Sequence, residues 1–393
     1  MTKDDKNMVT FSNHHIKMKT NLPYLDEVLS TFSFPKEFVK VTAFGSGLIN
    51  DTYLISYTTN GKKYILQRIN HQVFKNVEVL MDNILKVTAH IQEQLKRRYP
   101  IGFEQKTLIV EQAFDGEYMH KDLSGDYWRV FNYIENTKSY DNAATAKQAF
   151  EGGRGFGEFH SFLSNFDPAT INETIPDFHN MNKRLADFWL AVQTNPLSRV
   201  KNIAAEIALI KAKAARMSYI LEQGNLGNLP LRVIHNDTKL SNVLLDQNDI
   251  AQCVIDLDTV MPGYVAYDFG DAIRTIANTA AEDEADLDKI NVNLSFYKAF
   301  TTGYLNETIG FLSQNEIDSL AEGVILFPYM QAVRFLTDYI NGDHYYKTNF
   351  EGHNLQRAKA QLQLFIKMEE QQEELKSIVY QISKSIILLN NYA

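Results

Sequence analysis

The sequence has only one cysteine, Cys253, in 393 residues. A single thiol excludes an internal disulfide and a cysteine-based zinc site, and it fits a reducing compartment. Because Cys253 opens the apolar run Cys253-Val254-Ile255, we expect a small core residue rather than a reactive thiol. The sequence also lacks a signal-peptide-like N-terminal segment and any uncharged apolar run of about 18 residues. We therefore expect no signal peptide, no transmembrane helix and a cytoplasmic location.

Basic residues are too few to make the chain positive, since 39 Lys and Arg oppose 48 Asp and Glu for a formal net charge of −9. This balance argues against a nucleic acid or an anionic membrane as the main partner, so any anionic ligand must be bound by local groups. Glycine (19) and proline (9) are too scarce for a fibrous or disordered chain. The length suggests two domains or lobes at about 100–200 residues each. The sequence leaves the oligomeric state open.

The first third of the chain is typical of an antiparallel sheet. The expected strands cover residues 38–47, 52–57, 63–69, 107–110 and 127–134. Asn60-Gly61 between two of these runs is a strong hairpin signal, because both turn positions need positive φ. Apolar residues recur at spacings of three and four from Val77 to Leu95. This spacing predicts an amphipathic helix that can pack on the sheet.

Beyond Tyr140 the pattern becomes helical. Helical patterns cover about residues 143–165, 182–193, 203–223, 286–310, 315–340 and 354–389. One β-rich island, residues 231–260, interrupts them. No long linker rich in proline, glycine or serine separates the halves, so the lobes should share a tight hinge. We predict an α+β protein with a small antiparallel-sheet N-terminal lobe (1–134), a hinge (135–141) and a larger, mainly helical C-terminal lobe (142–393).

The β-rich island carries the candidate catalytic residues. An apolar strand leads into Asp237, Asn242 follows five residues later, and a second apolar strand leads to Asp256. The Asp-to-Asn spacing is that of the kinase catalytic loop H-R-D-x-x-x-x-N, whose Asp accepts the substrate hydroxyl proton and whose Asn binds Mg²⁺. Asp256 then takes the place of the metal-binding aspartate of D-F-G. In the alternative interpretation, His235, Asp237 and Asn242 only shape turns.

These residue types suit Mg²⁺ and ATP. Mg²⁺ prefers oxygen donors, and one carboxylate with one amide carbonyl suffices when phosphates and water fill the other positions. A carboxylate facing the acceptor hydroxyl can orient it and take its proton late, because phosphoryl transfer depends mostly on positioning and electrostatic stabilisation. Asp258 lies two residues after Asp256, so on a strand both would face the same side.

The segment Gly45-Ser46-Gly47 lies between two expected strands. Small residues there let backbone N–H groups approach phosphate oxygens, which favours a phosphate cover over a simple hairpin turn. The segment lacks the third glycine of G-x-G-x-x-G, and its strand-to-strand setting argues against a dinucleotide fold.

Three segments together resemble a known family. HNDTKLSNVLLD (235–246), VIDLDTVMPG (254–263) and YDFGDAIR (267–274) are similar to segments of the aminoglycoside phosphotransferase and choline kinase superfamily. Within it, the N-acetylhexosamine 1-kinases resemble the chain over nearly its whole length. The resemblance implies a protein-kinase-like fold and ATP- and Mg²⁺-dependent phosphorylation of the anomeric hydroxyl of N-acetylglucosamine or N-acetylgalactosamine. The implied partners are a nucleotide and a sugar.

The resemblance also assigns roles by position. The residues expected near the sugar, or between sugar and metal, are Asp51, Asp258, Arg334 and Tyr345. Asp268 would brace the catalytic loop. For Arg334, a buried ion pair is an equal alternative to a place near the sugar. Gln67 replaces the ATP-binding lysine of kinases, so phosphate binding is expected to depend more on Mg²⁺ and the adjacent Arg68. Phe131 and Tyr133 are the expected adenine contacts beside the hinge.

Two departures from the resembled sugar kinases concern the acceptor. Leu48 replaces a histidine and Thr275 replaces an aromatic residue, and each change removes a contact that could recognise a hexose. The alternatives are a kinase of another sugar or an amino alcohol, and an aminoglycoside kinase. The last would need several acidic groups at its site, and the acidic run 282–288 has no evident tie to the catalytic loop in the sequence. A catalytically silent kinase-like binding protein is a further alternative, suggested by Gln67.

Overall fold

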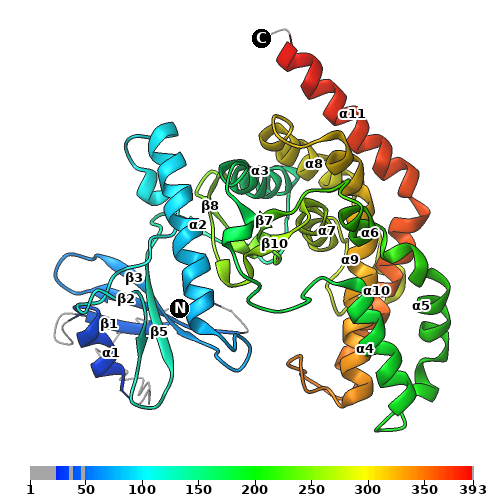
Figure 1. The fold of residues 1–393 in the computed structure, drawn as a ribbon, viewed down its shortest axis with the longest axis horizontal. Coiled ribbons are helices and arrows are strands. Elements are labelled where there is room, and N and C mark those ends of the chain that lie inside the picture. Colours follow the sequence, from blue (N-terminus) through cyan, green and yellow to red (C-terminus); the bar gives the residue numbers. More distant parts are fainter. Residues whose placement is uncertain (1–23, 35–38, 46–48, 392–393) are drawn as a thin grey trace, which may run out of the picture.

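The structure is a computed structural model that describes residues 24–34, 39–45 and 49–391. Figure 1 shows a smaller lobe built on a sheet and a larger lobe built mainly from helices. No helix within these ranges is both long and apolar enough to cross a bilayer.

The N-terminal lobe contains one antiparallel five-stranded sheet in the order β1-β2-β3-β5-β4. Its strands are β1 (Val39–Ala43), β2 (Asp51–Tyr57), β3 (Lys63–Ile69), β4 (His120–Lys121) and β5 (Tyr127–Asn132). Side chains alternate between two faces. One face, which includes Leu66 and Val130, packs on the short helix α1 (Leu25–Thr31), and the other, which includes Ile69 and Phe131, packs on α2 (Val77–Arg98).

Helix α2 lies between much of the sheet and the C-terminal lobe (Figure 1). The Asn76 side chain accepts a hydrogen bond from the Val79 N–H at its start, and Lys96, Arg97 and Arg98 complement the helix dipole at its end. Its buried residues follow the spacing that the sequence predicts, including Leu80, Ile84, Val87, Ile91 and Leu95. The apolar stripe thus fixes the helix on the cleft-facing side of the sheet.

The prediction of a separate strand at residues 107–110 is wrong. Only Val110 forms a bridge, to Phe131, beside the hydrogen bonds from Glu111 N–H to Val130 O and from Asn132 N–H to Ile109 O. The segment therefore follows β5 without forming a regular ladder, and β4 pairs with β5 instead.

The C-terminal lobe is mainly helical. Its helices are α3 (Ala146–Phe162), α4 (Met181–Thr194), α5 (Ala204–Met217), α6 (Tyr219–Asn225), α7 (Val265–Ile276), α8 (Leu294–Thr308), α9 (Gln314–Asn341), α10 (His353–Glu370) and α11 (Gln372–Asn391). Its short strands are β6 (Thr137–Lys138), β7 (Arg232–Ile234), β8 (Val243–Asp246), β9 (Ala251–Val254) and β10 (Met261–Gly263). Strand β6 pairs with β8, so part of the predicted hinge already belongs to the sheet of this lobe.

Helices α3 and α8 cross with their backbones in direct contact. A Cβ atom added at Gly153 would lie 2.1 Å from the Phe300 carbonyl oxygen, and one at Gly303 would lie 2.1 Å from the Phe150 carbonyl oxygen. On the other side of α3, a Cβ at Gly152 would lie 2.9 Å from the side chain of Leu240. Side chains larger than hydrogen do not fit at these positions.

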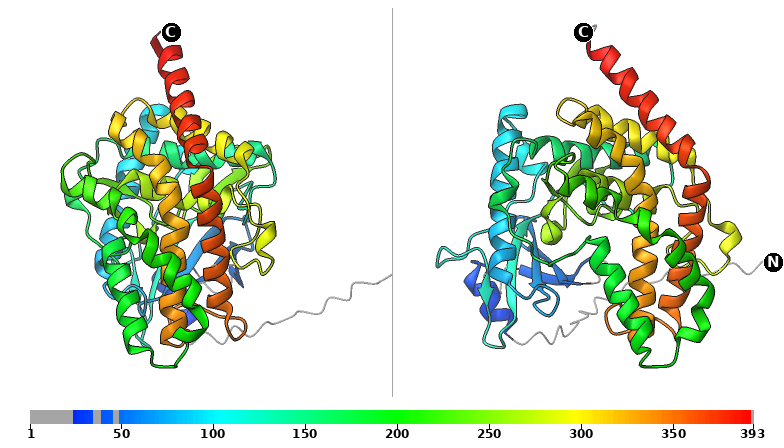
Figure 2. Two further views of the ribbon diagram at one scale, coloured as in Figure 1. Left: turned by 90° about the vertical axis from the view of Figure 1, so that its right-hand side faces the viewer. Right: turned by 45° about the vertical axis from the view of Figure 1, so that its right-hand side comes forward.

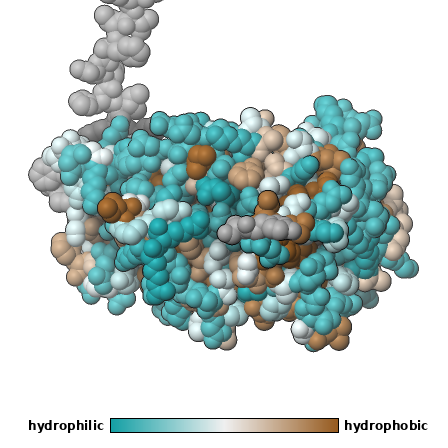
Figure 3. All heavy atoms as spheres, turned by 90° about the horizontal axis from the view of Figure 1, so that it is seen from above, coloured by the Kyte–Doolittle hydropathy of each residue, from teal (hydrophilic) through white to brown (hydrophobic). Residues whose placement is uncertain are grey.

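Helix α11 extends beyond the rest of its lobe, as the red helix in Figure 2 shows. Leu375, Val379 and Ile382 are buried against the core, whereas Leu388 and Leu389 near its end are exposed. Elsewhere the face in Figure 3 is mostly hydrophilic with scattered hydrophobic atoms, as is normal for a globular surface.

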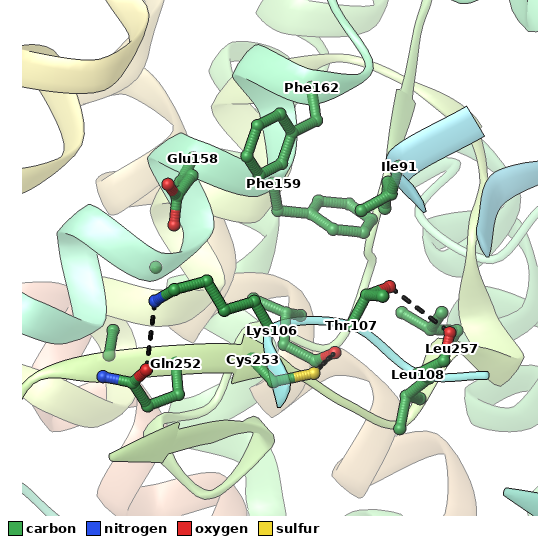
Figure 4. Close-up of a pocket in the computed structure, with 13 residues that line it drawn as sticks. Ile91, Lys106, Thr107, Leu108, Glu158, Phe159, Phe162, Gln252, Cys253 and Leu257 are labelled. Carbon is green, nitrogen blue, oxygen red and sulfur yellow. Dashed lines mark hydrogen bonds between the residues drawn. The ribbon is translucent and has the colours of Figure 1, made fainter. Parts of the chain in front are cut away.

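Cys253 is a core residue, as the sequence predicts, with 5% of its surface exposed. Burial raises the pKa of its thiol to about 12, so the reactive thiolate is scarce at neutral pH. Figure 4 shows it in a pocket beside Lys106, whose ammonium donates a hydrogen bond to Gln252 at 3.0 Å. None of the residues that line this pocket is a predicted site residue.

Candidate functional site

The predicted catalytic loop, residues 235–242, begins where β7 ends. Strand β7 pairs with β10, and the chain after Ile234 turns at Asn236, which has a left-handed φ of 65°. The His235 ring packs between Phe156 and Phe159, and its Nε2 lies 2.9 Å from the Ile255 carbonyl oxygen. Because Ile255 precedes Asp256, the buried histidine connects the catalytic loop to the predicted metal-binding segment.

Asp268 braces the same loop from α7. Its two carboxylate oxygens accept hydrogen bonds from the N–H groups of His235 (2.6 Å) and Asn236 (2.7 Å), and Oδ2 also lies 2.8 Å from His160 Nε2. Burial by itself would raise the pKa of Asp268, but these hydrogen bonds and the His160 ring outweigh it and hold the pKa below its usual value. An ionised, fully buried carboxylate therefore fixes the backbone that presents Asp237.

Asp237 and Asn242 lie in direct contact. The Asn242 side-chain N–H group donates to the Asp237 carbonyl oxygen at 2.8 Å and to its carboxylate at 3.2 Å. The Lys239 ammonium lies 2.8 Å from the other carboxylate oxygen. Burial opposes ionisation of Asp237, yet the Lys239 charge prevails and lowers its pKa. The side chain keeps 25% of its surface exposed, so an ionised carboxylate is accessible at neutral pH.

Asp256 faces the same region. The Ile255 N–H donates to the Asn242 carbonyl oxygen at 2.9 Å, which ties the two segments together. Asp256 has a left-handed φ of 63° and reaches solvent. The surrounding protein desolvates its carboxylate, the Asp258 and Asp237 charges repel it, and together they raise its pKa to about 7. Excess negative charge at this point is what a bound cation would neutralise.

This donor set fits Mg²⁺. Asn242 directs its amide N–H group toward Asp237, which leaves its Oδ1 as the atom available to a metal. No group of three or more His, Cys, Asp and Glu side chains suited to a metal occurs in the part of the chain that the structure describes. One carboxylate and one amide oxygen are typical of Mg²⁺ bound together with phosphates and water, rather than enclosed by protein ligands.

Asp258 makes interlobe contacts instead of facing open solvent. One of its carboxylate oxygens lies 2.6 Å from Arg129 Nη2, and the other accepts a hydrogen bond from the Asn50 side chain at 2.6 Å. Asp256 and Asp258 do not point the same way, because Leu257–Thr259 forms a 3₁₀ turn and not a strand. The strand assumption behind their predicted common orientation is wrong.

Gln67 and Arg68 lie on opposite faces of β3. Gln67 accepts hydrogen bonds from the Arg129 guanidinium, whereas Arg68 pairs with Asp51 and Asp126 at the sheet surface. The structure thus brings Arg68 and Asp51 together, away from Gln67 and Arg129.

The residues predicted to bind the nucleotide differ in their surroundings. Gly45 has a left-handed φ of 75°, which favours glycine, while Ser46, Gly47 and Leu48 lie outside the described residues. Phe131 is buried in the core beneath α2, and Tyr133 is half-buried with its ring 6.1 Å from that of Phe44.

Arg334 and Tyr345 come together on the C-terminal lobe. The Arg334 guanidinium lies 5.1–6.0 Å from the ring centres of Phe178, Tyr345 and Tyr346 and donates a hydrogen bond to Gln331. It forms no ion pair with a carboxylate among the described residues, so the predicted alternative of an ion pair is not what the structure shows. Tyr345 is 61% exposed.

The acidic run does connect to the catalytic loop. Glu282 accepts from Arg274 at 2.7 Å, Arg274 pairs with Asp271 at 2.8 Å, and Asp271 accepts from the Thr238 N–H at 3.2 Å. The separation inferred from the sequence is wrong, because Arg274 links segments that lie far apart in the chain. Thr275 is half-buried and donates only to the Ala272 carbonyl oxygen.

Three residues of the site were not predicted from the sequence: Lys239, Arg129 and Asn50. Lys239 could have been found from its position two residues after Asp237. Asn50 follows the glycine-rich segment by three residues, but its partner Asp258 is 208 residues away. Arg129 carries no local signal, because its role follows from the pairing of β3 with β5.

Comparisons with known proteins identify the fold. An aminoglycoside phosphotransferase from Alicyclobacillus acidocaldarius matches 88% of this chain and 95% of its own, with a TM-score of 0.58 at 14% identity. A choline kinase from Cryptosporidium parvum matches 91% of this chain and 94% of its own, with a TM-score of 0.52 at 15% identity. A Plasmodium vivax ethanolamine kinase matches 83% of both chains, with a TM-score of 0.50 at 12% identity.

These structures confirm the predicted α+β, protein-kinase-like fold with a small antiparallel-sheet lobe and a larger helical lobe. The sequence profile of the phosphotransferase enzyme family matches residues 40–302. This range contains Asp237, Asn242 and Asp256 and spans both lobes. The chain therefore belongs to the phosphotransferase enzyme family.

Proposed function

We propose that the protein is an ATP- and Mg²⁺-dependent kinase that phosphorylates the anomeric hydroxyl of an N-acetylhexosamine, N-acetylglucosamine or N-acetylgalactosamine. The observation that carries the proposal is the convergence of Asp237, Asn242 and Asp256 on one region between two connected loops. A catalytically silent protein would have no chemical need for an ionised, accessible carboxylate beside two oxygen donors suited to a metal.

The chain's own residues would divide the work. Asp237 orients the acceptor hydroxyl and takes its proton, and Lys239 keeps that carboxylate ionised before substrate binds. Asn242 and Asp256 would hold Mg²⁺, which would neutralise charge on the phosphates. Asp268 and His235 keep both loops in place, since a small displacement of a reacting group is costly to the rate.

The charges near the acceptor side favour a neutral acceptor over a polycation. The Arg334 and Arg184 guanidiniums are close enough for their repulsion to lower the pKa of Arg184, after the larger effect of desolvation. His179 is neutral, because burial and the Arg334 charge lower its pKa to about 3. The carboxylates of Asp271 and Glu282 are already paired with Arg274. An aminoglycoside or choline would meet unpaired positive charge here, whereas sugar oxygens can accept hydrogen bonds from Arg334.

The acceptor assignment is tested by ADP release with a panel of compounds. We expect N-acetylglucosamine or N-acetylgalactosamine to be turned over with the highest kcat/KM, and choline, ethanolamine and kanamycin to give background rates. Reducing the sugar to its alditol opens the ring and converts the anomeric hydroxyl into an ordinary primary alcohol, so turnover should be abolished if the cyclic hemiacetal is what the site recognises. Preferred turnover of an amino alcohol or an aminoglycoside would overturn the sugar assignment but keep the reaction type.

Replacement of Asp256 tests the metal role. We expect Asp256→Ala to weaken the apparent affinity for Mg²⁺ by at least about 10–100-fold, the loss typical of changes even outside the ligand shell. Titration calorimetry of ATP with and without Mg²⁺ would measure it. Asp288→Ala, which removes an exposed carboxylate outside the site, should behave like the wild type. Normal Mg²⁺ dependence in Asp256→Ala would refute the ligand role.

A further inference from the structure

Arg129 occupies a central place between the lobes that no sequence motif marks. We propose that Arg129 is a positioning residue: through Asp258, it holds the proposed Mg²⁺-binding segment against the N-terminal sheet. This inference rests on the proposed function, because it concerns how the site for Mg²⁺ and ATP is kept in shape.

A row of three polar side chains crosses the N-terminal sheet. Thr52, Gln67 and Arg129 are register partners on β2, β3 and β5, so they share the face of the sheet on which α2 packs. Gln67 donates to Thr52 Oγ1 at 3.1 Å and accepts from Arg129 Nε at 3.1 Å and Nη2 at 2.8 Å. A lysine at position 67 would place a second positive charge against Arg129. Gln67 and Arg129 are therefore a matched pair, in which β5 carries the positive charge and β3 the neutral acceptor.

Arg129 and Asp258 form a contact between the two lobes. Arg129 Nη2 lies 2.6 Å from Asp258 Oδ1, and the two side chains are only 1% and 3% exposed. Asn50, three residues after the glycine-rich segment, donates to the other oxygen of Asp258. Two separate parts of the N-terminal lobe thus hold one carboxylate, which lies two residues after the proposed ligand Asp256.

The buried ion pair of Arg129 and Asp258 has a cost in free energy. Burial of an ion pair costs desolvation, and replacing such a pair with apolar side chains of similar size is often neutral for stability or even favourable. Stability alone therefore gives little reason for Arg129 and Asp258 to remain charged inside the protein. Their geometry offers another reason: Arg129 donates two hydrogen bonds to Gln67 and forms an ion pair with Asp258, so it holds the 256–258 turn against the sheet.

The test compares Arg129→Met, Asp258→Leu and the double variant, with two measurements on each: thermal unfolding, and ATP binding by calorimetry with and without Mg²⁺. Each single variant should unfold at a lower temperature, because it leaves one buried charge unpaired. The double variant should regain most of the lost unfolding temperature. Its affinity for ATP in the presence of Mg²⁺ should nevertheless stay about 10–100-fold below that of the wild type, as expected for a lost outer contact of a metal site.

Recovery of both unfolding temperature and Mg²⁺-dependent ATP affinity in the double variant would overturn the positioning role, because the pair would then serve stability alone. Arg129→Lys is the matched control for charge: it keeps the cation but loses the fork, and we expect it to retain stability better than Arg129→Met while still binding ATP with Mg²⁺ more weakly than the wild type. A wild-type protein that binds no ATP with Mg²⁺ would instead refute the proposed function, and the role of Arg129 with it.

Discussion

Asp237→Asn is expected to lower kcat by about 10²–10⁴-fold, the usual loss when a general base is removed. The amide keeps the shape of the side chain and can still contact Asn242, but it cannot accept the hydroxyl proton. ATP affinity should change little, because the proposed ligands Asn242 and Asp256 remain. Steady-state kinetics with the best acceptor, together with calorimetry of ATP in Mg²⁺, would measure both quantities.

The matched control for this change is Asp82→Asn, which removes a carboxylate of α2 that is 48% exposed and pairs with Lys86. We expect its kcat to equal that of the wild type. Because the Asp237 side chain is partly exposed, we expect Asp237→Asn to unfold at the same temperature as the wild type. Equal unfolding temperatures would show that the lost rate does not reflect misfolding. Unchanged turnover in Asp237→Asn would defeat its assignment as the base.

Asp268→Ala is expected to lower the free energy of unfolding by about 3–5 kcal/mol, the range for breaking a buried charged pair. The change leaves the N–H groups of His235 and Asn236 and the His160 ring without their acceptor in the protein interior. Guanidinium unfolding followed by circular dichroism would measure the loss. The exposed Asp82→Ala variant should lose no more than about 0.5 kcal/mol, and a similarly small loss for Asp268→Ala would contradict the bracing role.

The pH dependence of unfolding gives this prediction a sign. Because the pKa of Asp268 is lower in the folded protein than in an unfolded chain, its contribution is complete above the unfolded value of about 4 and is lost as the pH falls through the folded value. The difference in stability between the wild type and Asp268→Ala should therefore be largest near neutral pH and shrink in acid. A difference that grows in acid would show that the ionised carboxylate is not what stabilises the loop.

The sequence predicts the helices and strands that have strong local patterns. The Asn60-Gly61 hairpin and the apolar stripe of α2 are both present, because turn chemistry and helical spacing act over a few residues. Residues 107–110 misled the prediction for the same reason: their apolar run is suited to a strand, but β5 pairs with them through one bridge only. The single helix predicted for 354–389 is also wrong in its middle, since α10 ends at Glu370 and α11 begins at Gln372.

The candidate site was predictable only in part. Asp237, Asn242 and Asp256 stand out because their spacing follows a chemical pattern that survives in the linear sequence. Asp258 contacts Arg129 and Asn50, which lie far from it in the chain. No local pattern encodes such a contact. The sequence also did not show which face of β3 Arg68 would take. Side chains alternate along the strand, so Gln67 lies on the face that carries Arg129 and Arg68 lies on the opposite face with Asp51.

The close crossing of α3 and α8 limits how this enzyme could be redesigned. Libraries aimed at new acceptors should leave the codons for Gly152, Gly153 and Gly303 fixed, because even alanine there would meet neighbouring atoms at 2.1–2.9 Å. A methyl group at Gly153 would push α3 away from α8 and toward Leu240, three residues from the proposed general base. Diversity is better placed at exposed positions such as Tyr345, where a new side chain would not shift the loop that carries Asp237.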